Sequence, residues 1–186
     1  MNETLLVIRN RRSVRNFRLE QIKDVELEEI LEAGKYAPSA ANQQSWHFTV
    51  VQNQVLLDRI SQAVKMIYKE LDEPFLRQLA NDEKFHLYFH APSVIVISGN
   101  QSAMFPDFDC SLAAENIMIA AESMDIGSCW VSGLPRLADS EIDMQILKDL
   151  DLPEGYKPLC AIALGYKEGT KAEAAVRKGN TVNYIR

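Results

Sequence analysis

Most of the information in this sequence lies in two segments: Arg11-Arg12-Ser13-Val14-Arg15-Asn16-Phe17 and Ala37-Pro38-Ser39-Ala40-Ala41-Asn42-Gln43-Gln44-Ser45-Trp46. The first brings three guanidinium groups and a hydroxyl together, and the planar fork of donors on each arginine suits phosphate oxygens. The second combines small residues with amides around a proline, so its backbone can approach a flat ligand while Asn42 offers a donor and an acceptor. The alternative interpretations are a solvated basic face and a simple turn between a helix and a strand.

The pattern of apolar residues around these segments predicts the remaining elements. Helices are expected over residues 3–10, from an N-cap at Asp24 to Gly34, over 56–68, over 109–125, and after an N-cap at Ser140. Buried strands are expected over 48–51, 94–98, 129–131 and 159–164. The helix over 109–125 is apolar on nearly all sides, so a partner subunit is one way to cover it. These elements predict a single α+β domain spanning residues 1–186.

Residues 71–90 form the least regular region and are rich in aromatic residues. Such a stretch can be a helix pair that adds to the core, or it can be a wall of a substrate pocket where rings stack on a flat acceptor. The sequence leaves both interpretations open.

Composition excludes several classes of function. The chain has 186 residues, 47% of them hydrophobic and 25% charged, and a formal net charge of -6. Neither a nucleic acid nor an anionic membrane is favoured as a partner of an acidic protein, so local basic clusters are interpreted as sites for small anions. We expect no membrane span, and the N-terminus lacks the basic start of a signal peptide. The prediction is a cytoplasmic protein.

Cysteine and histidine give no sign of a metal or a disulfide framework. Cys110, Cys129 and Cys160 are far apart and lie in apolar segments, so they are interpreted as small buried hydrophobes. His86 and His90 are four positions apart and could share a helix face, but nothing acidic is expected to complete a set of ligands there. We therefore predict no metal site.

The ordered set of motifs resembles the nitroreductase family, the FMN-dependent NAD(P)H oxidoreductases, over nearly the whole chain. Besides the two opening segments, the resemblance includes Ala91-Pro92-Ser93, the alanine-rich stretch 113–116, residues 127–133 and Ala163-Leu164-Gly165-Tyr166. It implies an α+β fold with an antiparallel-dominated sheet flanked by helices. It also implies an intertwined homodimer with two FMN molecules at the interface.

The resemblance also implies which residues hold FMN. Arg11, Arg12, Ser13 and Arg15 would contact the phosphate, the ribityl chain and the pyrimidine edge. Residues of the second segment would reach the same flavin from the other subunit, namely Pro38, Ser39, Ala40 and Asn42. Backbone N–H groups of Val131, Ser132 and Gly133 would lie near the reactive nitrogen of the flavin. Near the C-terminus, Arg177 or, as second choice, Lys178 would contact the phosphate.

The function that the resemblance implies is hydride transfer from NADH or NADPH through FMN to a nitroaromatic, a quinone or a related acceptor, by a ping-pong mechanism. The cofactor carries this chemistry, so no catalytic side chain is predicted. Two departures from the family pattern stand out: Ser45 replaces a common proline, and Ser132 stands where some members carry glutamate. A flavin-storing or flavin-sensing protein without turnover, and a specialised flavin dehydrogenase or dehalogenase, are the alternatives.

Overall fold

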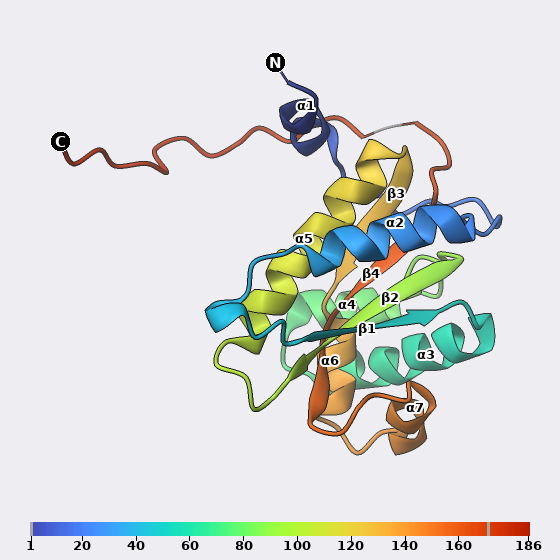
Figure 1. The fold of residues 1–186 in the computed structure, drawn as a ribbon. Coiled ribbons are helices and arrows are strands. Elements are labelled where there is room, and N and C mark those ends of the chain that lie inside the picture. Colours follow the sequence, from blue (N-terminus) through green and yellow to red (C-terminus); the bar gives the residue numbers. More distant parts are fainter. Residues whose placement is uncertain (1, 171) are drawn as a thin grey trace.

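Residues 2–170 and 172–186, which the computed structural model describes, form one four-stranded antiparallel sheet in the order β1-β2-β4-β3 (Figure 1). The strands are β1 (Trp46–Val51), β2 (Ser93–Asn100), β3 (Ile126–Val131) and β4 (Tyr156–Tyr166). The edges of the sheet are therefore β1 and β3, and the two motif-bearing segments lie next to these edge strands in the sequence or in space. The predicted antiparallel α+β fold is confirmed.

Helices cover both faces of the sheet. One face carries α2 (Asp24–Lys35) and α5 (Pro106–Ser123), and α1 (Glu3–Asn10) contacts α5 (Figure 1). The other face carries α3 (Gln54–Glu70), α4 (Pro74–Asn81), α6 (Gly133–Ala138) and α7 (Met144–Asp149). A short 3-10 turn, η1 (Ala40–Asn42), lies in the second motif.

Alternation along the central strands divides the core into two halves. In β2, Val94 and Val96 face the cluster under α3 and α6, whereas Ile95 and Ile97 face the cluster under α2 and α5. Successive side chains of a strand point to opposite faces, and a strand covered on both faces reads as a continuous apolar run. For this reason the apolar run of residues 94–97 predicts a strand that is covered on both faces.

Helices α2 and α5 approach each other closely at Gly34. A Cβ atom at Gly34 would lie 2.9 Å from Cγ1 of Ile117, so a larger residue would force the Ile117 side chain or α5 to shift. This close contact holds the last turn of α2 against α5, shortly before the loop that contains the second motif.

Several helix boundaries differ from the sequence prediction. Asp24 is the first residue of α2 rather than its N-cap, because Lys23 precedes the helix and its N–H donates to the Glu26 carboxylate at 3.0 Å. The predicted helix over 109–125 spans Pro106–Ser123, since proline is favoured in the first turn of a helix. Along it, Phe108 and Leu112 are exposed, so it is not buried on all sides.

The region after β3 also differs from the prediction. The six-residue helix α6 was not predicted, because so short an element shows no apolar periodicity and contains Pro135. The helix expected after Ser140 begins only at Met144, with Asp143 as its N-cap. The Ser140 hydroxyl instead accepts a hydrogen bond from the N–H of Ile142 at 3.3 Å, which closes a turn.

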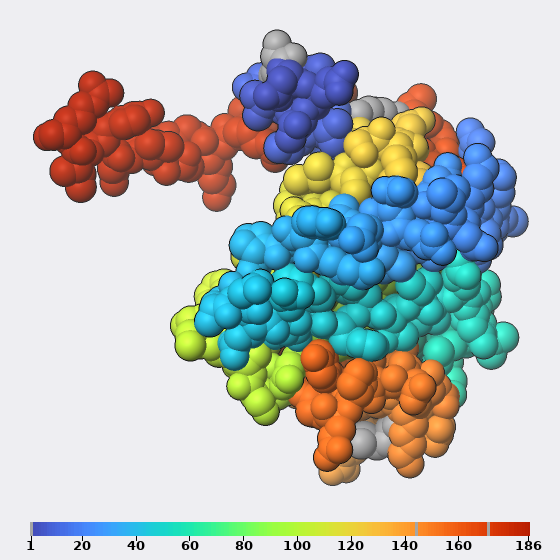
Figure 2. Space-filling model, viewed as in Figure 1, coloured from blue at the N-terminus to red at the C-terminus, as the bar shows by residue number. Residues whose placement is uncertain are grey.

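Cys110, Cys129 and Cys160 are buried and free, as expected. Among the described residues, no helix is long and apolar enough to cross a membrane. Residues 172–186 contain no helix or strand and extend away from the body of the protein (Figure 2).

Candidate functional site

The arginine-rich segment runs beside the edge strand β3. The N–H of Val14 donates to the carbonyl of Ser128 at 2.9 Å, and Ser13 and Ser128 form an isolated parallel bridge. This approach requires the glycine at position 127, because a Cβ atom there would lie 2.9 Å from Cγ1 of Val14. The backbone that carries Arg11, Arg12, Ser13 and Arg15 is therefore held on the sheet, although the segment itself forms no helix or strand.

Two guanidinium groups of this segment have unused donors. Nε of Arg11 and Nε of Arg12 are buried atoms without a hydrogen-bond partner, although the Arg11 side chain as a whole is 25% exposed. Nε of Arg11 lies 3.6 Å from the Glu115 carboxylate, which is an ion pair but too long for a hydrogen bond. Buried charged donors normally find acceptors. Both side chains are only partly buried and Arg12 lines a cleft, so these guanidinium groups could turn to bind an anionic group such as a phosphate.

The exposed side chain of Arg15 contacts an aromatic ring. Its guanidinium carbon lies 5.6 Å from the centre of the Phe89 ring, in cation–π geometry. A cleft of about 530 Å³ lies against this segment. It is lined in part by Arg12, Ser13 and Arg15, and in part by Lys167, which pairs with Glu122 at 2.9 Å.

The thiol of Cys129 lies beside the arginine segment but is not suited to act as a nucleophile. Burial raises the pKa of Cys129, and the positive charge of Arg15 opposes this effect without reversing it. The thiolate is the reactive form of cysteine, so Cys129 stays an inert thiol near neutral pH.

The second motif forms a tightly hydrogen-bonded loop. The Ser39 hydroxyl accepts from the N–H of Gln44 at 2.9 Å, and the carbonyl of Ala40 accepts from the N–H of Gln43 at 3.0 Å. Asn42 has an exposed side chain whose Oδ1 accepts from Nε2 of Gln44 at 3.2 Å. The side-chain amide of Asn42 therefore lies at the surface of a loop whose shape is fixed by internal hydrogen bonds.

This loop is anchored by a residue that the sequence did not single out. Asp109, in the first turns of α5, accepts from the N–H of Ala40 at 2.9 Å and from the hydroxyl of Ser45 at 2.7 Å. The signal that could have found it is a carboxylate among the apolar residues of this helix, because such a residue must be either exposed or paired.

The end of β3 leads directly into α6. Val131 is buried, Ser132 is exposed and precedes α6, and Gly133 is the first residue of that helix. A Cβ atom at Gly133 would lie 2.5 Å from Cδ1 of Leu87, so glycine allows α6 to pack against the segment before β2. The predicted turn is thus a strand-to-helix connection, with Ser132 as its exposed residue.

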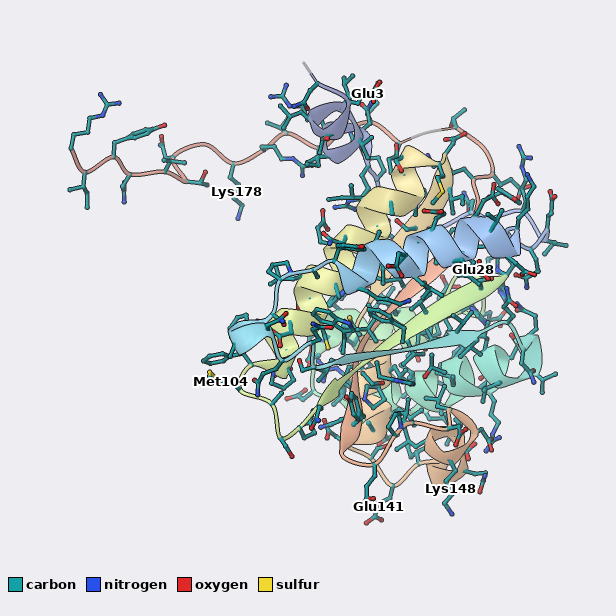
Figure 3. All side chains as sticks on the ribbon, in the orientation of Figure 1. Glu3, Glu28, Met104, Glu141, Lys148 and Lys178 are labelled. Carbon is teal, nitrogen blue, oxygen red and sulfur yellow. The ribbon has the colours of Figure 1, made fainter. Side chains whose placement is uncertain are left out.

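The structure does not bring the two basic tail residues to the arginine segment. Arg177 and Lys178 are exposed in the extended tail, and Figure 3 shows Lys178 clear of the body of the protein. Their predicted contact with the phosphate requires a different position of the tail, or a second copy of the chain.

The aromatic region 71–90 contributes mainly to the core. It contains α4 and a following loop, and Tyr88 is fully buried while Phe85 and Phe89 pack against the same core cluster. Phe75 is exposed. Most of these rings therefore support the fold.

The expectation that nothing acidic lies with His86 and His90 was wrong. Asp58 of α3 brings a carboxylate to His86 and His90, so that one ligand atom from each of the three residues lies within 4.8 Å of the others. Yet Nδ1 of His86 accepts from the N–H groups of Tyr88 (3.2 Å) and His90 (3.0 Å), and its Nε2 faces Asp58. A neutral histidine that binds a metal through Nε2 carries its proton on Nδ1, which these two donors oppose. The cluster is better suited to support the loop than to bind a metal.

Comparison with known proteins identifies the family. The model of the nitroreductase family matches residues 8–166. A protein of Archaeoglobus fulgidus named as a putative NADH dehydrogenase/NAD(P)H nitroreductase is 34% identical over 176 residues, covering 92% of this chain and 89% of that protein. The chain belongs to the nitroreductase family.

Solved structures agree with this assignment. A nitroreductase with bound FMN from Bacteroides fragilis superimposes with a TM-score of 0.91 at 35% identity, and each chain is covered completely. A nitroreductase with bound FMN from Desulfitobacterium hafniense gives a TM-score of 0.90 at 28% identity, again with complete coverage of both chains.

Proposed function

We propose that this protein is an FMN-dependent oxidoreductase that takes hydride from NADH or NADPH and passes it to a nitroaromatic, quinone or related acceptor. The observation that carries the proposal is that Nε of Arg11 and Nε of Arg12 are buried without a hydrogen-bond partner, on a segment fixed to β3. In a chain of net charge -6, such a local cluster suits a small anionic ligand. The names of the relatives supply the chemistry: FMN as the bound group and NAD(P)H as the donor.

The residues around this segment fit the different parts of FMN. Arg11 and Arg12 would hold the phosphate by charge-assisted hydrogen bonds, and Ser13 would add a hydroxyl donor. Arg15 would place positive charge at the pyrimidine edge, where the ring gains negative charge on reduction. The backbone at Val131, Ser132 and Gly133 would lie along the ring.

The other half of the site would come from a partner subunit. Pro38, Ser39, Ala40 and Asn42 lie on a loop anchored to the start of α5, whereas Arg11 pairs with Glu115 farther along the same helix. We propose that the loop of one protomer meets the arginine segment of the other. Arg177 or Lys178 would then reach a phosphate through the extended tail.

An intertwined homodimer accounts for the apolar surface of the single chain. Phe108 is 68% exposed and, with Phe105 and Leu112, borders the loop residues 38–40 around a hollow of about 330 Å³. The tail adds further exposed apolar side chains. Large exposed apolar patches are typical of surfaces that another chain covers. Residues 1–186 would form one such domain per subunit, in the cytoplasm.

The bound flavin would supply the chemistry by accepting hydride from NAD(P)H and then donating it to the acceptor. The two half-reactions would alternate in one pocket, as in a ping-pong mechanism. The residues of the chain bind and orient the ring and tune its electrostatics. We assign no catalytic side chain, since Cys129 is held as a thiol.

The visible spectrum of the purified protein tests the proposal. We expect a yellow protein that bleaches when NADH or NADPH is added without oxygen, and that recovers its colour with a nitroaromatic or a quinone. A yellow protein that neither donor bleaches would instead favour storage or sensing of flavin. A colourless protein that takes up no added FMN would refute the flavin site itself.

A further inference from the structure

The loop around Asn42 is held in an unfavourable backbone conformation. Ala41 (φ 50°), Asn42 (φ 54°) and Gln44 (φ 46°) all lie in the left-handed region. Residues other than glycine rarely adopt this conformation, and asparagine tolerates it best. Three such residues within four positions therefore need support from the surrounding structure.

Asp109 supplies that support from both ends of the loop. Its Oδ1 accepts from the N–H of Ala40 at 2.9 Å, and its Oδ2 accepts from the Ser45 hydroxyl at 2.7 Å. Asp109 is only 1% exposed and Ser45 only 2%. A buried carboxylate is strongly unfavourable unless it is paired, so these two donors and the carboxylate fix one another.

The opposite side of the loop is tied to the same region of the protein. The N–H of Met104, shortly before α5, donates to Oε1 of Gln43 at 2.9 Å, and Figure 3 places Met104 beside this loop. The hydrogen bond from Met104 is exposed, whereas both bonds to Asp109 involve a buried acceptor. Asp109 is therefore the main link between the loop and α5.

We propose that Asp109 is a positioning residue, which sets the left-handed loop so that Asn42 is ready to contact the flavin before the flavin binds. This inference rests on the proposed function, because the loop is assigned to FMN there. Without Asp109, the loop would relax toward ordinary backbone conformations. FMN binding would then have to order the loop again, so affinity would fall although no flavin contact has been removed.

The test compares FMN affinity in variants of the full-length protein. Asp109→Asn removes the charge with little change of volume, and Ser45→Ala removes one of the two donors. Asp107→Asn is the matched control, because Asp107 lies in the same first turn but is exposed. Each apoprotein is titrated with FMN, and the visible circular dichroism of the bound flavin reports the setting of its ring.

We expect Asp109→Asn to weaken FMN binding about tenfold or more, Ser45→Ala to do so by a smaller factor, and Asp107→Asn to leave it unchanged. The decisive measurement is a double-mutant cycle with Asn42→Gly. If Asp109 acts through Asn42, the second substitution reduces affinity less in the Asp109→Asn background than in the wild type.

Two results would overturn the inference: equal FMN affinity of wild type and Asp109→Asn per folded protein, or additive effects of Asp109→Asn and Asn42→Gly. A purely structural role predicts loss of thermal stability with an unchanged flavin spectrum and no such coupling. If Asp109→Asn does not fold, the same cycle is run with Ser45→Ala. A wild-type protein that binds no FMN would refute the proposed function, an outcome distinct from either of these.

Discussion

Nε2 of His86 lies 3.1 Å from Oδ1 of Asp58, and this hydrogen bond holds the imidazole proton on the nitrogen that faces α3. The other nitrogen, Nδ1, is thereby free to accept the N–H groups of Tyr88 and His90. These bonds support a loop in which Phe89 (φ 56°) and His90 (φ 54°) are both left-handed. Since the Phe89 ring contacts the Arg15 guanidinium, a buried histidine indirectly supports one wall of the candidate site.

Protonation of His86 would disrupt this arrangement, because an N–H at Nδ1 would face two N–H donors. Burial lowers the pKa of His86, the charge of His90 lowers it further, and Asp58 opposes both effects. The folded protein thus binds this proton less readily than the unfolded chain does. Above the unfolded-state pKa of about 6.5, His86 is neutral in both states and makes its full contribution to the free energy of unfolding. As the pH falls below that value, the unfolded chain takes up the proton first and stability is lost, until His86 is protonated in the folded state as well.

We therefore expect the melting temperature of the wild type to decrease as the pH is lowered from about 7.5 to about 5.5. The melting temperature of His86→Gln should decrease less over the same interval. Glutamine can accept and donate in similar directions but does not titrate. His47→Gln is the control and should follow the wild type. Equal pH dependence of wild type and His86→Gln would show that other groups cause the acid sensitivity.

The arginine segment gives the most direct prediction on cofactor binding. Arg11→Ala combined with Arg15→Ala should yield a folded protein that is largely free of flavin, because each charge-assisted bond removed costs about 1.5–3 kcal/mol. Titration of FMN into the apoprotein measures the loss. Arg77→Ala is the control, since Arg77 is exposed on α4 and pairs with Asp72. An unchanged affinity in the double variant would mean that the cluster is only a surface feature.

Asn42 can be tested without disturbing the backbone. Asn42→Gly removes the amide group but keeps a residue that adopts positive φ freely, so apoprotein stability should change little. If the amide bonds the flavin, FMN affinity should decrease by about 1–3 kcal/mol, because a polar group of the cofactor loses its partner. Apoprotein melting and FMN titration are measured on the same sample. A loss of stability with full affinity would remove Asn42 from the site.

The quaternary structure is predicted to be a homodimer that buries upward of about 2,000 Å². Sedimentation at micromolar concentration should give a single dimeric species in the wild type. Deletion of residues 172–186 should weaken the dimer and FMN binding together, because the tail carries exposed apolar side chains and Arg177. A stable monomer with full activity would contradict both the dimer and the shared site.

Local patterns in the sequence were sufficient for the long elements. The apolar run of residues 94–97 predicted β2, and the spacing of Leu56, Ile60 and Val64 predicted α3, because long periodic segments are dominated by burial. Short elements were missed or misplaced, as with α6 and the start of α7, since a six-residue helix offers too few positions for a periodic signal.

The sequence by itself determined the fold class, the family and the two segments to which we assign the candidate site, because these depend on residue types in a fixed order along the chain. Only the tertiary structure decided which residues hold those segments in place. Asp109 lies far from Ala40 in the sequence, and Asp58 lies far from His86, yet each pair is joined by a hydrogen bond. Such contacts are created when helices pack on a sheet, so no local pattern contains them.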